Sequence, residues 1–165
     1  MSEHAHHQAE AQLKNILALV ERLNHARECD GEEECSADHK TLAVGLGLSP
    51  AAELTLEDLR DYHDEDKVMS AILEDPLEVL VRSDWHGMGD CYPPMQYCIL
   101  LSTGGPAVRI IGDLSLEHRT PESCTLQYQD WFTEWMDYPL SKNEIELVLT
   151  YVQQFFTDLG LLDAL

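Results

Sequence analysis

The stretch MQYCILLSTGGPAVRIIG, residues 95–112, decides the fold class of this chain. Two apolar runs rich in Ile, Leu and Val, residues 95–102 and 106–112, flank Thr103-Gly104-Gly105. Such runs, bounded by Gly, Pro and Ser, favour β-strands. Glycines tolerate the positive φ angles that a short connection requires. The sequence therefore predicts an antiparallel hairpin here.

Two further segments on either side have the same β character: residues 77–82 (LEVLVR) and 124–131 (CTLQYQDW). Short sequential connections place consecutive strands side by side. We expect a four-stranded antiparallel meander.

Helical periodicity marks both ends of the chain. Ser141 and Glu144 form a capping box, and apolar residues then recur at helical spacing from Ile145 to Phe156. Residues 9–27 carry an apolar stripe, with Lys14, Glu21 and Arg22 expected to face outward. A second capping pair predicts one helix from residue 55 to Asp75-Pro76, because proline disfavours helix in the residue before it.

These elements predict a single α+β domain over residues 1–165. Residues 1–76 form a helical N-terminal part with an acidic loop at 28–39, and residues 41–54 form a short helix or an irregular packed segment. Residues 77–165 form the sheet and a C-terminal helix packed on one sheet face.

Charge limits the function classes. The chain has 31 Asp and Glu against 10 Lys and Arg, a formal net charge of −21. Residues 1–76 hold 18 acids and 6 bases, and residues 77–165 hold 13 and 4, so the excess is distributed over the chain. Such a surface repels nucleic acid and anionic membranes and attracts basic proteins. We expect a basic protein partner and no direct contact with nucleic acid or membrane.

Other features of the sequence indicate the cellular compartment. The sequence has no run of eighteen apolar residues, and MSEHAHHQAE lacks the basic and apolar stretches of a signal peptide. Five cysteines, an odd number without a compact pairing pattern, indicate reduced thiols. We expect a cytoplasmic protein.

Candidate chemistry is sparse. His4, His6 and His7 lack the defined four-ligand set of a structural metal site. Ser83, Asp84 and His86 have triad residue types, but triads assemble from separate segments, and a reactive Cys91 has no supporting pattern. Cys98 fits a small buried hydrophobe. The sequence predicts neither enzyme nor metal nor cofactor, and a small hydrolase is the third-ranked alternative.

The loop at 83–94 (SDWHGMGDCYPP) differs from the other connections because it is long and aromatic. Trp85 fits two interpretations, an exposed anchor for a protein partner or a small core beneath the loop. We expect Trp131, Phe132 and Trp135 to pack in the core where the sheet meets the closing helix.

The segment 81–151 resembles a family of small acidic proteins of bacterial mobile elements and phages. The resemblance rests on Trp85, on the run GGPAVRI at 104–110 and on YQDW at 128–131. It implies an accessory protein of a mobile element acting in the bacterial host cell. Small acidic proteins of such origin include inhibitors of host defence, some of which mimic DNA; this is an analogy of origin and charge.

Our leading hypothesis is a non-enzymatic, anti-CRISPR-like inhibitor of a host nucleic-acid-binding defence complex, most plausibly a CRISPR effector. Its carboxylates would occupy a basic surface as a DNA mimic. The alternative is a protein-binding adaptor or regulator that uses loop 83–94, with acidity serving solubility only. Oligomeric state stays open. The expected contact residues are Glu32, Glu33, Glu34, Glu57, Asp58, Asp61, Asp64, Glu65, Asp84, Trp85 and Asp90.

Overall fold

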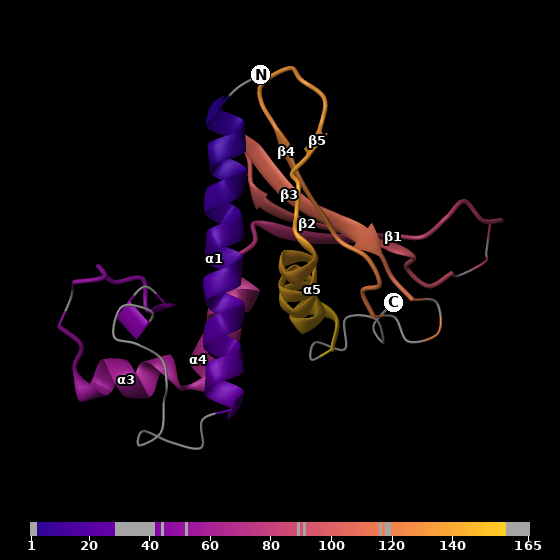
Figure 1. Cartoon of the computed structure of the whole chain (residues 1–165). Coiled ribbons are helices and arrows are strands. Elements are labelled where there is room, and N and C mark those ends of the chain that lie inside the picture. The colour runs from indigo at the N-terminus through magenta and orange to yellow at the C-terminus, as the bar shows by residue number, and fades with distance from the viewer. Residues whose placement is uncertain are drawn as a thin grey trace.

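Figure 1 shows the chain as a computed structural model, in which a long N-terminal helix lies against a twisted sheet and the closing helix lies beside it. The structure describes residues 3–28, 42–43, 45–51, 53–88, 90, 92–115, 117 and 120–157. Of the expected acidic loop at 28–39, Glu28 ends the first helix, and residues 29–39, with Glu32, Glu33 and Glu34, lie outside the described residues.

The order of elements confirms the α+β class. In chain order the elements are α1 (Glu3–Glu28), α3 (Leu56–Tyr62), α4 (Glu65–Glu74), β1 (Glu78–Arg82), β2 (Gln96–Ser102), β3 (Ala107–Asp113), β4 (Thr125–Gln129), β5 (Met136–Asp137) and α5 (Lys142–Thr157). Between α1 and α3, residues 42, 43 and 45 are helical, and the backbone N–H of Leu46 donates to the carbonyl of Leu42 at 3.1 Å.

The sheet is an antiparallel meander in the order β1-β2-β3-β4-β5. The prediction of four strands is wrong, because β5 adds a fifth. Only two residues of β5 pair with β4, and a strand of two residues is too short to show an alternating pattern in the sequence. The predicted hairpin of β2 and β3 is confirmed, and Gly104 and Gly105 have φ angles of 100° and 84°.

One sheet face forms the core. Side chains alternate across a strand, so in β2 Tyr97, Ile99 and Leu101 are buried while Cys98 points to the opposite face. Helix α1 contacts β3, β4 and α5, and its predicted apolar stripe is confirmed. The core between α1 and the sheet contains buried residues from both elements: Ala5, Ala9, Leu13, Ile16, Val20 and Leu23 of α1, and Val108, Ile110, Leu126 and Tyr128 of the sheet.

Helix α5 closes the same face, as predicted. Its capping box is confirmed, since the backbone N–H of Ser141 donates to Glu144 Oε2 at 2.7 Å and that of Glu144 donates to Ser141 Oγ at 3.3 Å. At its other end, the rings of Phe156 and Tyr97 are 5.5 Å apart. Hydrophobic residues of α5, including the fully buried Val148 and Tyr151, join the core.

The opposite sheet face carries a polar ladder and no packed helix among the described elements. Arg109 lies 3.9 Å from the ring centroid of Trp135 and donates to Gln127 Oε1 at 3.0 Å, while Gln127 donates to Asp137 at 2.7 Å. A hollow of about 560 Å³ opens on this face. Cys98 lines it and is half-buried, so its expected place in the core is wrong.

The aromatic segment after β4 corrects a second expectation. Phe132 is fully exposed, Trp131 is 62% exposed, and Trp135 stacks on Arg109 outside the core. Strand β4 ends at Gln129, so Trp131, Phe132 and Trp135 lie in the connection that leads to β5, outside the contact between the sheet and α5. A Cβ atom at Gly105 would meet Trp131 Nε1 at 2.2 Å, which places the indole over the β2–β3 hairpin.

Asp75 joins three helices. Its Oδ2 accepts a hydrogen bond from the Tyr151 hydroxyl of α5 at 2.7 Å, and its Oδ1 accepts one from Asn15 of α1 at 2.8 Å. Its backbone N–H donates to Ile72 and caps α4. Burial, followed by the Asp75 carboxylate, raises the pKa of Tyr151, so its hydroxyl stays a donor at all physiological pH values.

The variant Tyr151→Phe tests this joint. We expect it to lower the free energy of unfolding by about 1.5 kcal/mol, because a hydrogen bond from a buried donor to a charged acceptor is lost. The matched control is Tyr92→Phe, which removes the hydroxyl of a ring that is 55% exposed and should change stability by less than about 0.5 kcal/mol. Urea denaturation measures both, and equal losses would contradict the assignment.

Candidate functional site

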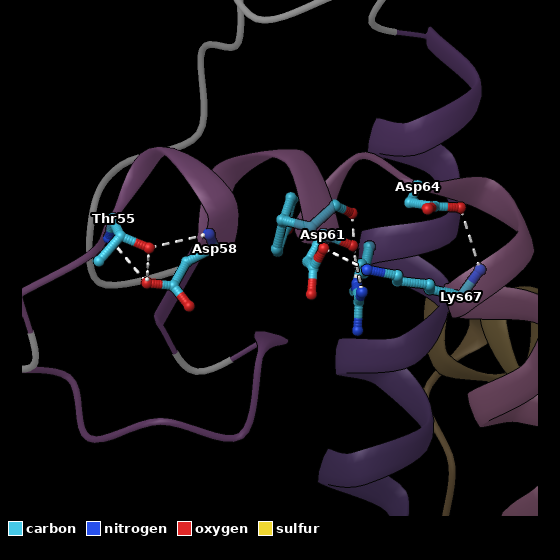
Figure 2. Close-up of polar contacts among 7 residues, drawn as sticks. Thr55, Asp58, Asp61, Asp64 and Lys67 are labelled. Carbon is cyan, nitrogen blue, oxygen red and sulfur yellow. Dashed lines mark hydrogen bonds and ion pairs between the residues drawn. The ribbon is translucent and has the colours of Figure 1, made fainter.

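The predicted acidic helix is two helices. Figure 2 shows Thr55 and Asp58 at the start of α3, and Asp64 and Lys67 at the start of α4. The side chain of Asp64 accepts from the backbone N–H of Lys67 at 3.2 Å and begins α4. A second N-cap inside the expected helix is the physical reason for the break. The sequence contained this signal, since Asp64 precedes an acidic first turn.

Most of the helix carboxylates named as contact residues have partners inside the chain. Asp58 accepts from the Thr55 backbone N–H at 2.7 Å and from its hydroxyl at 2.6 Å, and these hydrogen bonds lower the pKa of Asp58. Asp61 pairs with Lys67, and Glu65 pairs with Arg27 at 2.7 Å. Glu57 is exposed. These carboxylates therefore stabilise the local fold as well as contributing to the acidic field.

Arg22 holds α3 against α1. Its guanidinium donates to the backbone carbonyls of Asp61 and Tyr62, at the C-terminal end of α3, and lies 5.8 Å from the Tyr62 ring centroid. The expectation that Arg22 faces outward is wrong, because it is only 8% exposed. A cation at a helix C-terminus satisfies carbonyls that have no partner within the helix. Burial lowers the pKa of Arg22.

Loop 83–94 has an ordered base. Met95 N donates to Arg82 O at 2.9 Å where the loop closes, and Asp84 Oδ1 accepts from the backbone N–H of Trp85 at 2.8 Å. The His86 and Tyr92 rings lie 5.2 Å apart across the loop. Trp85 and Met88 are nonetheless fully exposed. Of the two interpretations of Trp85, the structure therefore gives the exposed one, with no small core around its ring.

A hollow of about 950 Å³ lies beside Trp85, between the start of the loop and the turn that follows β3; we call it the loop hollow. Its ionisable residues are four carboxylates, Asp84, Asp113, Glu117 and Glu122, and one guanidinium, that of Arg82. Hydrogen bonds from Gln96 and Ser123 lower the pKa of Asp113, which keeps this carboxylate ionised. The loop hollow therefore combines negative charge with an exposed indole.

Sequence reasoning found only part of this site. Asp84 and Trp85 were among the expected contact residues, and both line the loop hollow. Asp90 lies elsewhere in the loop, where its backbone N–H donates to Gly87 O at 3.1 Å. Asp113, Glu117 and Glu122 were missed, because the antiparallel pairing of β2 with β3 brings them to the loop from a distant part of the sequence.

The sequence named His86, Cys91 and Cys98 as candidates for chemistry. His86 Nδ1 lies 3.0 Å from the backbone oxygen of Asp84, its neighbour in the loop. Burial raises the pKa of the Cys98 thiol, and raises that of Cys124 to about 11, so both thiols are poor nucleophiles at neutral pH. Cys91 lies outside the described residues. Within the described ranges, no three His, Cys, Asp or Glu residues are grouped to hold a metal ion.

No family model, curated protein or solved structure matches the chain. The resemblance of residues 81–151 to acidic proteins of mobile elements therefore stays a prediction. Among the described helices, none has the length and apolar character needed to cross a membrane.

The variant Arg22→Met tests how α3 is held. It keeps the buried alkyl chain but removes the donors to two carbonyls, so we expect amide hydrogen exchange in α3 to become at least about tenfold faster, the equivalent of about 1.4 kcal/mol. Exchange in β2 and β3 should change little. The control is Lys14→Met on the same helix, where the lost ion pair to Glu10 is exposed. Unchanged exchange in α3 would refute the role of Arg22.

Proposed function

We propose that this chain is a non-enzymatic protein-binding regulator that captures a basic segment of a partner protein at the loop hollow. The observation that carries the proposal is the fully exposed Trp85 beside four carboxylates. A basic segment with an apolar neighbour matches both features. Lys and Arg side chains place an alkyl stem against apolar surface and a charge near carboxylates.

The exposure of Trp85 and Met88 supports contact with a protein. Leaving such side chains in water forgoes about 1.5–3 kcal/mol each relative to burial. Aromatic residues and methionine are enriched in the buried centres of protein interfaces. The hydrogen bond that organises Trp85 N limits the freedom of the loop base, so less conformational entropy is lost when a partner orders it.

Charge supports the basic character of the partner. The net charge of −21 attracts a basic protein from a distance and speeds encounter. Close to the loop hollow, a guanidinium or ammonium could stack on Trp85, a contact that adds about 0.5–2 kcal/mol. Affinity should fall as salt rises, because the attraction between exposed charges is screened.

A second candidate function is inhibition of a host nucleic-acid-binding defence complex, such as a CRISPR effector, by DNA mimicry. The size and spread of the negative charge favour it, because a basic groove built for phosphates also attracts carboxylates. It ranks second because Asp58, Asp61, Asp64 and Glu65 are engaged in caps and ion pairs within the chain. Both candidates place the protein in the bacterial cytoplasm.

Two tryptophan variants provide a matched test. Trp85→Ala should weaken the partner captured from bacterial lysate by at least about 30-fold, as expected for an interface anchor. Trp131→Ala removes an indole that is also exposed but lies at the opposite end of the sheet, and it should change affinity by less than about twofold. Titration with the purified partner measures both. Equal effects would reject the loop hollow.

Charge reversal separates the two candidates. The pair Glu57→Lys and Asp66→Lys changes four units of charge at exposed residues of α3 and α4 outside the caps and ion pairs described above. DNA mimicry predicts a loss of affinity well beyond about threefold and competition by DNA, because the whole acidic surface takes part. Capture at the loop hollow predicts at most about a threefold loss and indifference to DNA. The same partner titration distinguishes these outcomes.

A further inference from the structure

The two edges of the sheet differ. At one edge, β5 is two residues long and Pro139 is the second residue after it, so this edge offers little backbone for pairing. At the other edge, β1 is five residues long and, within the described part of the chain, pairs only with β2. Its side chains are exposed too: Leu80 is 48% exposed and Val81 is 36% exposed. An open apolar edge strand is a template for another strand.

The sequence of β1 is complementary to itself. It reads Glu78-Val79-Leu80-Val81-Arg82, with one acid and one base at equal distances from the central leucine. Antiparallel pairing of two copies about a twofold axis at Leu80 places each Glu78 opposite Arg82 of the second copy. Opposite charges in directly facing positions stabilise a strand pair, whereas like charges destabilise it.

We propose that two copies of this chain associate through β1, pairing antiparallel about Leu80 to form one continuous sheet. A twofold axis makes the contact self-complementary and closes it as a dimer. Pairing would satisfy the backbone groups of β1 that point away from β2, because alternate residues of an edge strand have no partner on that side.

Both faces of the paired strands would gain matched contacts. Glu78, Leu80 and Arg82 lie on the open sheet face, since they face Leu100, Cys98 and Gln96 of β2. There, Leu80 would meet Leu80 of the second copy between two Glu–Arg pairs. Val79 and Val81 lie on the helix-covered face, opposite Ile99 and Tyr97, and would pair valine to valine with the second copy.

The local charge permits this contact despite the acidity of the chain. Residues 76–83 (PLEVLVRS) contain one acid and one base, so this segment is neutral within a chain of net charge −21. Arg82 uses Nε to donate to Gln96 at 2.7 Å, and this hydrogen bond leaves the terminal nitrogens of the guanidinium for Glu78 of the second copy. In about 0.15 M salt the Debye length of about 8 Å screens repulsion between distant carboxylates while contact pairs persist.

Sedimentation equilibrium of the purified chain, from about 1 µM to about 1 mM, tests the proposal in a range where weak dimers are measurable. The unmodified chain should show a reversible monomer–dimer equilibrium. Either Glu78→Arg or Arg82→Glu creates two like-charge contacts in the dimer and should weaken it at least about tenfold. Leu80→Lys, which places charge at the centre of the strand, should do the same. Circular dichroism verifies that each variant is folded.

The decisive experiment mixes the two charge variants, E78R and R82E. The E78R chain carries two arginines at these positions and the R82E chain carries two glutamates, so each alone should associate at least about tenfold more weakly than the unmodified chain, while the mixture should form a heterodimer. The double variant E78R/R82E should regain self-association to within about threefold of the unmodified chain. A monomeric unmodified chain, or a dimer unaffected by the single variants and by L80K, would overturn the proposal, as would a mixture without heterodimer.

The dimer and the loop hollow are tested separately. The experiment uses the chain alone, so it needs no partner. Trp85→Ala should dimerise like the unmodified chain, because Trp85 lies outside the paired segment. If dimerisation fails while Trp85→Ala still loses the partner, the proposed function stands and only the dimer is rejected.

Discussion

Packing of the α1 stripe against a single face of the sheet constrains the rest of the molecule. Ile16, Val20 and Leu23 are fully buried in this contact, and α5 fills the space beside them. The helices α1 and α5 cover the sheet face centred on β3 and β4, and α4 packs against both helices. Among the described elements, no helix packs on the other face or along the edge at β1. The polar ladder around Gln127 lies on the open face, whereas the edge at β1 leaves Leu80 and Val81 exposed.

The sequence predicts those features of the fold that depend on residues close together in the chain. Ser141 and Glu144 act within one turn, and the period of residues 95–112 is local, so the closing helix and the hairpin were both foreseeable. Features that depend on contacts between distant residues could not be predicted from the sequence. β5 exists because Met136 can pair with Tyr128, and Arg22 is buried because α3 ends against it. The exposure of Trp131 depends on where β4 stops.

The candidate site follows the same rule. Trp85 stands out in the sequence as an aromatic residue in a long loop, but its two interpretations differ only in what surrounds it, and surroundings are a tertiary property. For the carboxylates, the sequence gives the total charge but not the role of each residue. A count of acids gives the field of the whole protein, yet it does not separate Asp64, which caps a helix, from Glu122, which lines the loop hollow.

The two proposals meet at β1, because the loop hollow begins at Arg82, the last residue of that strand. In a dimer paired about Leu80, the two Arg82 positions would be four residues apart along the strands, roughly 13 Å at 3.3 Å per residue. The two loops would then leave the joined sheet in opposite directions, each with its own acidic hollow. A partner with two basic segments could engage both, and the second binding event would be intramolecular, which raises overall affinity without any new contact. Weak self-association would then be sufficient, because a bivalent partner also stabilises the dimer that binds it.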